Sequence, residues 1–380
     1  MNPSSGIYTI IFFWFCTSIG INEVCFGQEI INNPEKGISQ DRVPVPITFE
    51  MEEVFGSEFS EENEIFISSA KAIWEVDTDE DGNVNVMDID LPMLAKFSPD
   101  GILEWKRDRK GRGPGDLENA YSLAVSNSIY ISNIRGTRID VIDKQGNFIK
   151  SVSLDHLGKD SSYDIVGVLE DKFLVLNSEI VGSIGVEVHV LDIDNGFSLV
   201  SEFKVTEDPG ISLPANASIL SQASIADSTI IITKNLSYGV QYYSFDGKLI
   251  KEINRKFPRF MRPGIYNPGR QRGVMVALGG VFSQYKISRG YLINYVVWPE
   301  DIENIDMVAQ KMSEGNFPVF FQKNSIDIYS PTGKLLYSKE GQGSIPEIGK
   351  LSHTDNEGFL YTVATEPFPQ IRKYRVVLEE

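Results

Sequence analysis

Short apolar runs alternate with polar positions along most of this chain. The runs are rich in Val, Ile, Tyr and Phe, and clusters of Gly, Asn and Asp separate them. Runs of this kind are typical of β-strands bounded by turns, so we expect an all-β fold. Residues 299–315 form the one predicted helix, because a Pro starts the segment, acidic residues fill its first turn and a Gly ends it.

The predicted strands recur at regular intervals. A tight glycine turn follows an alternating strand at five positions, Gly101, Gly146, Gly196, Gly247 and Gly333. The spacing indicates a unit of about 46 to 50 residues, and the helical insertion stretches the last interval. The chain is therefore predicted to consist of internal repeats.

A second landmark gives the same period. The segments that begin at Gly111 and Gly341 align without gaps, which places Ile129 over Phe359. Their offset corresponds to five units of about 46 residues. An apolar strand such as SIYISN or FLYTVA occurs once per unit, six times in all. Six repeats of this length, with four strands each, predict a six-bladed β-propeller.

The repeat pattern resembles a known family. GRGPGDL, starting at Gly111, and the turns of the form D-x-x-G resemble six-bladed propellers of the NHL and TolB-like kind, over about residues 60–380. Such propellers are common among exported bacterial proteins. They serve as lactonases, lyases, binders and assembly scaffolds, so the resemblance implies a fold and not a reaction.

The last repeat lacks one strand. Only one strand follows FLYTVA, so we expect a strand between Val45 and Ala70 to complete the final blade and to join both ends of the chain in it. Accordingly, residues 28–46 are interpreted as a polar linker and residues 47–380 as the propeller. We expect a monomer.

The first 27 residues are interpreted as a secretory signal. Residues 7–21 form an apolar run that is short for a membrane span, and Gly27 offers a small residue for cleavage. The mature protein would then be periplasmic or extracellular and would have no membrane span. An uncleaved anchor is one alternative, and a lipoprotein anchored at Cys25 is another, disfavoured because Val24 precedes it.

Composition narrows the chemistry further. Both cysteines, Cys16 and Cys25, lie in the predicted signal, so the mature chain would have no thiol nucleophile and no disulfide. The formal net charge of −18 disfavours nucleic acid as a partner, because phosphate binding needs a broadly basic surface.

The stretch DTDEDGNVNVMDID resembles a calcium-binding loop. Asp77, Asp79, Asp81 and Asp88 have the spacing of loop ligands, with Gly82 at the turn. Such a loop needs a helix after it, but valines and asparagines alternate here as in a half-buried strand. The blade interpretation is therefore favoured, and calcium at this stretch stays the alternative.

Other motifs for catalysis or cofactors are missing from the sequence. His156, His189 and His353 fall in different repeats, which favours packed or surface histidines over a metal site. The sequence has no HExxH, no G-x-S-x-G and no P-loop. We assign no catalytic residue and expect no metal or cofactor.

A basic segment interrupts the acidic chain. No Asp or Glu occurs from residue 254 to residue 289. Arginine forks bind carboxylates and phosphates, and aromatic rings stack on sugars or peptides. We expect an anionic ligand, or an acidic protein or glycan partner, to bind through Arg255, Arg259, Arg262, Tyr266, Arg270 and Arg272, with Phe260 as another stacking residue. The alternative is a solvated basic loop.

Two functions follow from the sequence. The favoured one is an exported, non-enzymatic propeller that binds a ligand or partner on one face. The alternative is a calcium-dependent hydrolase or lyase that resembles gluconolactonase. The basic segment and the helical insertion are both expected on the binding face, because of where they interrupt the repeats.

Overall fold

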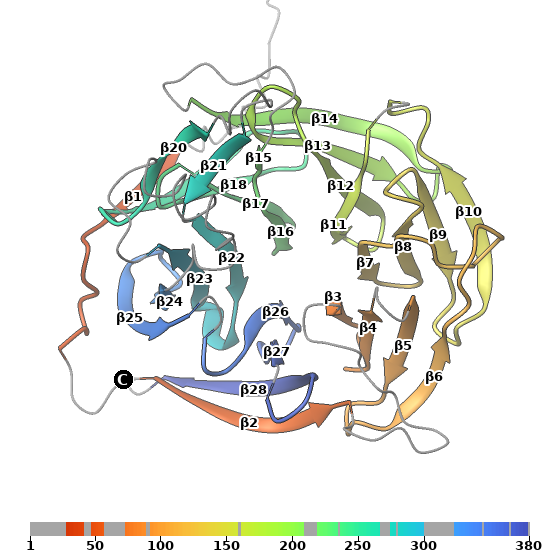
Figure 1. Ribbon diagram of the computed structural model, residues 1–380, viewed down its shortest axis with the longest axis horizontal. Helices are drawn as coiled ribbons and strands as arrows, with labels where there is room; N and C mark the ends of the chain where they lie inside the picture. The colour runs from red at the N-terminus through yellow and green to blue at the C-terminus, as the bar shows by residue number, and fades with distance from the viewer. Residues whose placement is uncertain are drawn as a thin grey trace, which may run out of the picture.

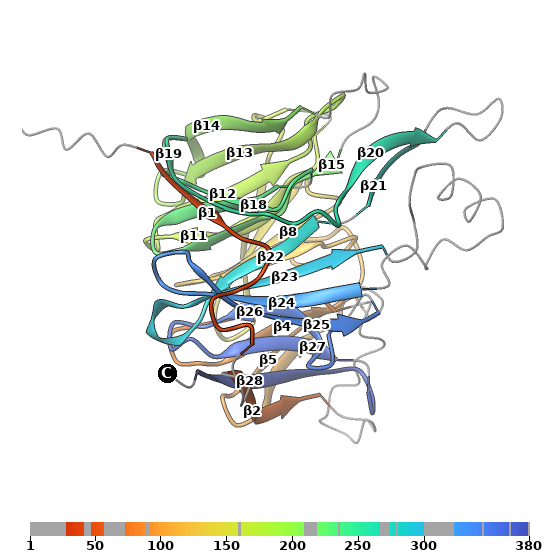
Figure 2. The ribbon, with the colours of Figure 1, turned by 90° about the vertical axis from the view of Figure 1, so that its left-hand side faces the viewer.

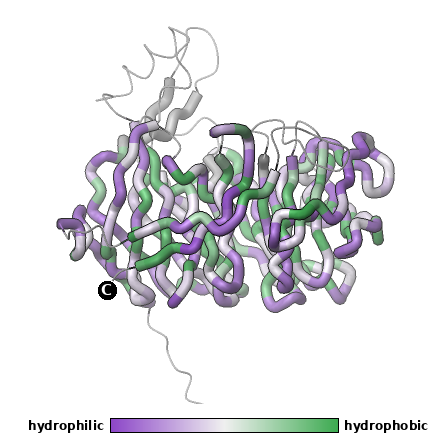
Figure 3. Tube along the Cα trace, turned by 90° about the horizontal axis from the view of Figure 1, so that it is seen from below, coloured by the Kyte–Doolittle hydropathy of each residue, from purple (hydrophilic) through white to green (hydrophobic). Residues whose placement is uncertain are grey.

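The computed structural model describes most of the chain. It covers residues 28–41, 47–56, 73–88, 92–158, 161–208, 219–234, 236–266, 274–278, 280–299, 323–343, 346–364 and 366–378. The described residues form 28 β-strands and one 3-10 turn, Ser288–Gly290. Hydrophobic and hydrophilic residues alternate along the strands, as Figure 3 shows. The all-β prediction is confirmed.

Six blades form a ring, and each has a core of four antiparallel strands (Figure 1). The first blade consists of β3 (Ile73–Thr78), β4 (Val84–Asp88), β5 (Met93–Phe97) and β6 (Leu103–Arg107). The second consists of β7 (Ser122–Val125), β8 (Ile129–Asn133), β9 (Arg138–Ile142) and β10 (Phe148–Ser153). The third consists of β11 (Asp164–Leu169), β12 (Phe173–Ser178), β13 (Ile184–Asp192) and β14 (Ser198–Glu207). The fourth consists of β16 (Ala223–Ala226), β17 (Thr229–Thr233), β18 (Gly239–Tyr243) and β19 (Leu249–Arg255). The fifth consists of β22 (Gly280–Lys286), β23 (Leu292–Trp298), β24 (Lys323–Tyr329) and β25 (Leu335–Gln342). The sixth consists of β26 (Lys350–Thr354), β27 (Leu360–Ala364), β28 (Gln370–Leu378) and the N-terminal strand β2 (Ile47–Phe55). The predicted six-bladed propeller is confirmed.

The first strand of each blade lines the centre of the ring. The innermost strands touch in the order β3, β7, β11, β16, β22 and β26, and β26 returns to β3. The second strands, β4, β8, β12, β17, β23 and β27, are the six apolar landmark strands of the repeat, and they are largely buried. The hydrophobic core therefore lies within and between the blades and surrounds a central channel.

The N-terminal strand β2 closes the ring. It pairs antiparallel with β28, from Ile47 opposite Leu378 to Phe55 opposite Ile371. Both ends of the chain thus share the sixth blade, and β2 covers the edge that β28 would otherwise expose. The predicted closure is confirmed.

An extra strand covers the edge of the fourth blade. β1 (Glu29–Asn33) lies within the segment that we interpreted as a linker and pairs parallel with β19. The Asn33 side chain donates to the carbonyl oxygen of Gly333 at 3.0 Å and accepts the amide of Leu335 at 2.8 Å. This strand therefore links the outer strands of the fourth and fifth blades.

The glycine turns of the repeat seat one blade on the next. Gly146 adopts a φ of 85°, which only glycine enters without strain. A Cβ on Gly146 would lie 2.9 Å from the ring of Trp105 in the preceding blade, and the Trp105 indole donates to the carbonyl oxygen of Lys144 at 3.0 Å. Gly247 has the same relation to Phe203. The predicted turn residues thus also set the packing between blades.

The aspartate-rich stretch forms a strand hairpin. β4 follows the turn directly, where a calcium loop would need a helix. The Asp79 carboxylate accepts the amide of Asn83 at 2.9 Å and lies 3.1 Å from the ammonium nitrogen of Lys96. The blade interpretation is confirmed. The predicted helix falls almost entirely in residues 300–322, outside the described part of the chain.

The ring has two distinct faces. The turn face carries the turns between the first and second strands of the blades, such as residues 79–83 and 355–359. The connection face lies opposite, and there β20 (Met261–Tyr266) and β21 (Val274–Leu278) form a hairpin that extends beyond the ring (Figure 2). The described part of the chain has no helix long and apolar enough to cross a bilayer.

Candidate functional site

A cavity of about 480 Å³ lies in the central channel at the turn face. The innermost strands of all six blades line it, together with the turns that follow them. A volume of this size is typical of sites for small organic ligands. The cavity is therefore the strongest candidate site in the described part of the chain.

The walls of this cavity are acidic. The lining contains one imidazole, that of His353, and neither a lysine nor an arginine. Its carboxyl side chains are those of Glu75, Asp77, Glu170, Asp171, Asp227 and Asp355. An enclosed site with one sign of charge attracts ligands of the opposite sign.

Strand alternation places two of these carboxyls in the channel. Residues two apart in a strand share a face, so Glu75 and Asp77 both line the cavity from β3. Val76 between them is 2% exposed and packs into the core of the blade. The polar positions of β3 were visible in the sequence, but their common orientation toward the channel depends on the ring.

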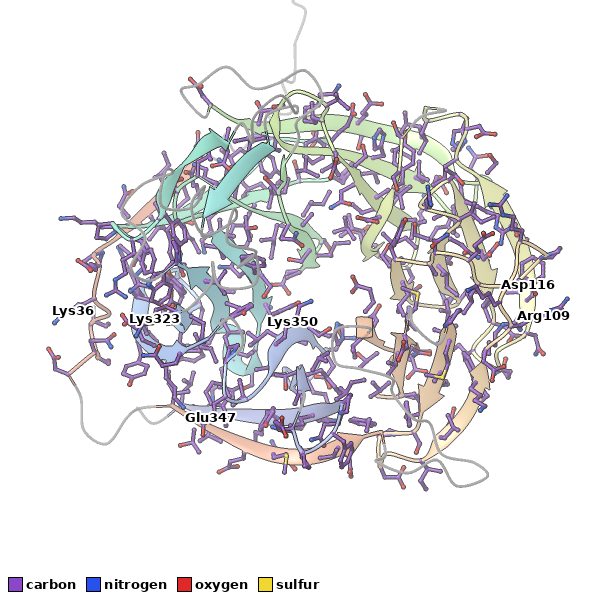
Figure 4. The ribbon with its side chains drawn as sticks, viewed as in Figure 1. Lys36, Arg109, Asp116, Lys323, Glu347 and Lys350 are labelled. Carbon is purple, nitrogen blue, oxygen red and sulfur yellow. The ribbon has the colours of Figure 1, made fainter. Side chains whose placement is uncertain are left out.

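Glu75 is the lining carboxyl that is partly buried and still lacks a hydrogen bond or ion pair among the residues that the structure describes. Burial raises its pKa to about 8; nearby Lys350 opposes the rise, and Asp164 and Asp77 add to it. Figure 4 shows Lys350 beside the central opening. At pH 7 the Glu75 side chain is therefore mainly a neutral acid.

Asp77 and His353 form a pair across the first and sixth blades. Asp77 Oδ1 lies 3.3 Å from His353 Nε2, and the Thr78 hydroxyl lies 2.9 Å from the same nitrogen. Asp77 also accepts the amides of Val125 at 2.7 Å and Thr78 at 2.8 Å. Burial raises the Asp77 pKa, while His353 and these amides lower it. The pair places the His353 imidazole at the cavity wall.

Replacing Glu75 by Gln is expected to stabilise the protein at alkaline pH. Because the folded-state pKa lies above the ordinary value of 4.5, the fold loses stability as pH rises from 4.5 to about 8. The loss is on the order of 2 kcal/mol after screening by water in the channel. Thermal unfolding of the Glu75→Gln variant should show a higher Tm than the parent at pH 9 and a similar Tm at pH 4.

A surface carboxyl provides the control for this measurement. Glu50 is exposed on β2, so Glu50→Gln should shift the Tm little at either pH. Equal shifts for Glu75→Gln at pH 4 and pH 9 would contradict a raised pKa at Glu75.

The other two histidines lie outside the cavity. His189 is 2% exposed and packs edge-on against Tyr163, and burial lowers its pKa. The described residues contain no group of three or more His, Cys, Asp or Glu side chains that could hold a metal ion. Sequence reasoning missed the role of His353, because nothing in its local sequence distinguishes it from a surface histidine.

Arg255, a predicted ligand contact, lies in the protein interior. Its guanidinium is 2.5 Å from the Asp327 carboxylate, and their side chains are 3% and 0% exposed. It also donates to the carbonyl oxygen of Glu35 at 3.0 Å and lies over the ring of Phe257. Asp327 accepts the Tyr238 hydroxyl at 2.5 Å. Arg255 therefore joins the fourth and fifth blades to the N-terminal segment.

The other predicted contacts lie farther out on the connection face. Arg259 is 35% exposed, lies over the Trp298 ring and pairs with Glu340 at 2.5 Å. Arg262 and Tyr266 belong to β20. Two further predicted residues, Arg270 and Arg272, lie outside the described part of the chain, and Phe260 stacks on Tyr238. Arg259 also lies 3.8 Å from the Glu35 carboxylate, so the structure brings Arg255 and Arg259 together around Glu35. Anion binding by the segment stays a prediction.

Comparisons with known proteins support the fold. No protein-family model matches the chain, and no curated protein matches it in sequence. The structure is similar to a member of the DUF4221 family from Bacteroides vulgatus, with a TM-score of 0.56, 9% identity and coverage of 88% of this chain and 99% of that one. The structure is also similar to that of a protein from Bacteroides fragilis whose name describes it as exported, with a TM-score of 0.55 and 10% identity. The match covers 92% of this chain and 100% of that one. The TM-score with virginiamycin B lyase from Staphylococcus aureus is 0.45, at 11% identity, and the match covers 87% of this chain and 99% of that one.

Proposed function

We propose that this protein is an exported propeller that binds a small polar ligand in the cavity at the turn face of its channel. One observation carries the proposal: all six blades direct strand ends and polar side chains into one cavity of about 480 Å³. Glu75 adds weight, because its partly buried carboxyl has no partner among the residues that the structure describes, and carboxyls with a raised pKa in a cavity are typical of functional sites.

Export is part of this proposal. The apolar run at residues 7–21 and the small residue Gly27 have the layout of a cleaved signal. The similar protein from Bacteroides fragilis is itself named for export. An intact mass beginning at Gln28 would support the cleaved form, and a mass that retains residues 1–27 or carries acyl chains on Cys25 would indicate an anchored protein instead.

Filling the cavity should abolish binding. Thr354 lines the cavity at the end of β26, so a Thr354→Trp variant would occupy part of the space that a ligand needs. A library of polar small molecules, screened by thermal shift on the mature protein, would provide the ligand. We expect its Kd, measured by calorimetry, to rise at least tenfold in Thr354→Trp, a loss of about 1.4 kcal/mol or more.

A matched variant controls for the added ring. Ile149 is 51% exposed on β10, an outer strand, so Ile149→Trp adds a tryptophan away from the cavity and should leave the Kd unchanged. Ligands whose affinity survives Thr354→Trp would place the binding site elsewhere.

The basic segment supports a second binding surface on the connection face. We propose that its arginines, with Arg262, Arg270 and Arg272 as the main candidates, bind an anionic ligand or an acidic protein or glycan. The β20–β21 hairpin that carries the segment extends beyond the ring, opposite the cavity (Figure 2). A small ligand and a larger partner would therefore meet different faces.

An enzyme is the alternative function of the same cavity. The neutral Glu75 and the Asp77–His353 pair would supply a proton donor and a proton acceptor within one site. A hydrolase or lyase that resembles gluconolactonase would also need calcium. Loss of activity on chelation would favour that enzyme, and ligand binding that is indifferent to chelation favours the binding protein.

A further inference from the structure

We infer that the cavity recognises its ligand through a positively charged amine, and that Glu75 is the counter-ion for this amine. The inference rests on the proposed ligand-binding function and names the chemical class of the ligand. It follows from the charge of the lining, from the partners of each carboxyl and from the number of oxygens available.

The lining favours a cation. Six carboxyl side chains and a single imidazole face the cavity. Lys286 binds Asp227 at 2.6 Å and Lys373 lies 4.0 Å from Asp355, so lysines outside the lining compensate these two carboxylates. Lys350 acts on Glu75 from nearby without forming an ion pair with it, and the lining as a whole keeps an excess of acidic groups. The channel therefore attracts cations and repels anions, because walls of low dielectric focus the field.

Most of the carboxyls already have partners. Asp77 accepts two amides and pairs with His353. Asp171 accepts the Ser126 hydroxyl at 3.0 Å, and Asp355 accepts the Tyr361 hydroxyl at 3.0 Å. Two lining carboxyls, Glu75 and Glu170, have no partner within the described ranges, and of these Glu170 is exposed to solvent.

Glu75 is thus the partly buried carboxyl that a ligand can satisfy. No hydrogen bond or ion pair reaches it from the described residues, and it lies inside the channel, not at its rim. A buried carboxylate without a donor costs stability, and a donor brought by the ligand would remove that cost. An ammonium group offers three donors and a full positive charge.

An organic amine fits this site better than a metal ion. Calcium takes six to eight oxygen ligands. In the part of the chain that the structure describes, Glu75 is the one partly buried carboxyl of the cavity without a partner, and no group of three metal-ligating side chains occurs there. The volume of about 480 Å³ also suits a small molecule. Tyr285 lines the same space and offers an aromatic ring, which can attract an ammonium group.

Binding of an amine should release a proton. Glu75 is mainly protonated at pH 7, and it must ionise to pair with an ammonium group. The groups that act on or face it are Asp77 on its own strand, Asp164 on β11, Tyr285 on β22, and Lys350 and His353 on β26. With a starting pKa of about 8, release of about nine-tenths of a proton is expected at pH 7 if the amine binds the carboxylate.

The probe is 1,4-diaminobutane, with butane-1,4-diol as its neutral analogue. Titration of the full mature protein in unbuffered salt at pH 7, followed by calorimetry and by pH-stat, gives affinity and proton release together. We expect the diamine to bind and to release close to one proton. We expect the diol to bind at least tenfold more weakly and to release none.

Two variants assign the effect to Glu75. Glu75→Gln should weaken diamine binding at least tenfold and abolish proton release, and it should fold well because it removes a buried acid. Asp246→Asn, in an exposed turn of the fourth blade, removes an acid away from the cavity and should leave both readings unchanged. Glu75→Ala repeats the first test without an amide in the channel.

Several outcomes would overturn the inference. The amine would be wrong if the diol bound as tightly as the diamine, or if the diamine did not bind at concentrations up to about 50 mM. Glu75 would be the wrong counter-ion if Glu75→Gln left diamine binding intact. Calcium would be the better ligand if it displaced the diamine one to one. A neutral ligand whose affinity falls in Thr354→Trp and not in Glu75→Gln would overturn the amine and leave the proposed function standing. Diamine binding that is unchanged in Thr354→Trp would instead place the site outside the cavity.

Discussion

Deletion of residues 45–70 is expected to abolish cooperative unfolding. The deletion removes β2, which is the outer strand of the sixth blade and pairs along its length with β28. It also removes Phe55, a fully buried ring that lies 6.0 Å from Phe97 in the first blade and 6.3 Å from Tyr361 in the sixth. Without this strand the ring loses its closure and exposes a strand edge. Calorimetry should show no sharp transition.

Point variants separate closure from simple shortening of the chain. Phe55→Ala leaves β2 in place and removes its main buried contact, so it should lower the free energy of unfolding by about 3 to 5 kcal/mol. Met51 lies in the same strand and is 58% exposed, so Met51→Ala should change it by about 0.5 kcal/mol or less. A truncated protein that melts as late and as sharply as the parent would show that the ring closes elsewhere.

Removal of the Asp327 carboxylate is the second large expected effect. Asp327→Ala should lower the free energy of unfolding by about 3 to 5 kcal/mol, because it leaves the Arg255 charge buried without its counter-ion. The hydroxyls of Tyr238 and Ser338 would lose their acceptor as well. Chemical denaturation, with the midpoint and slope compared to the parent, measures the change.

An exposed ion pair of the same segment is the matched control. Arg259 pairs with Glu340, and their side chains are 35% and 48% exposed. Glu340→Ala should therefore cost about 1 kcal/mol or less. Similar losses for Asp327→Ala and Glu340→Ala would mean that the Arg255 pair contributes no more than a surface contact.

Local composition does not distinguish the buried Arg255 from the partly exposed Arg259. Arg255 and Arg259 are four residues apart in the same acid-free segment, and the sequence treats them alike. Their environments differ because Asp327 lies in another strand of the next blade, 72 residues away along the chain. A buried ion pair between distant segments leaves no local signal in either one.

Two blades share an aspartate–serine hydrogen bond that the sequence did not reveal. Asp140 on β9 accepts the hydroxyl of Ser151 on β10, and Asp327 on β24 accepts that of Ser338 on β25. Both pairs join the third and fourth strands of a blade, and each aspartate also pairs with an arginine, Arg138 in the second blade. Arg138 lies in the same blade as Asp140, whereas Arg255 comes from the blade that precedes Asp327. The two arginines therefore occupy different places in the repeat, and their common pairing with an aspartate is visible only in three dimensions.

The fold class and the number of repeats follow from local and periodic features of the chain. Alternation with a period of two predicts strands, and glycine turns near every 46 to 50 residues predict blades, because both signals depend on residues that are close along the chain. The closing strand followed from the same reasoning, since a final blade that lacks one strand leaves an edge to cover. These features are local or periodic, so no knowledge of the packing was needed.

Which polar residues meet in the cavity depends on how the six blades pack around the axis. Glu75 and Asp77 lie on the first blade and His353 on the last, and the sequence offers no reason to pair them. They become neighbours because the ring closes and brings β26 beside β3. The pKa of Glu75 likewise depends on burial in the channel and on Lys350 and Asp164, which other blades contribute. A site at the axis of a propeller is assembled from distant segments, so its chemistry is set by closure and not by any single stretch of sequence.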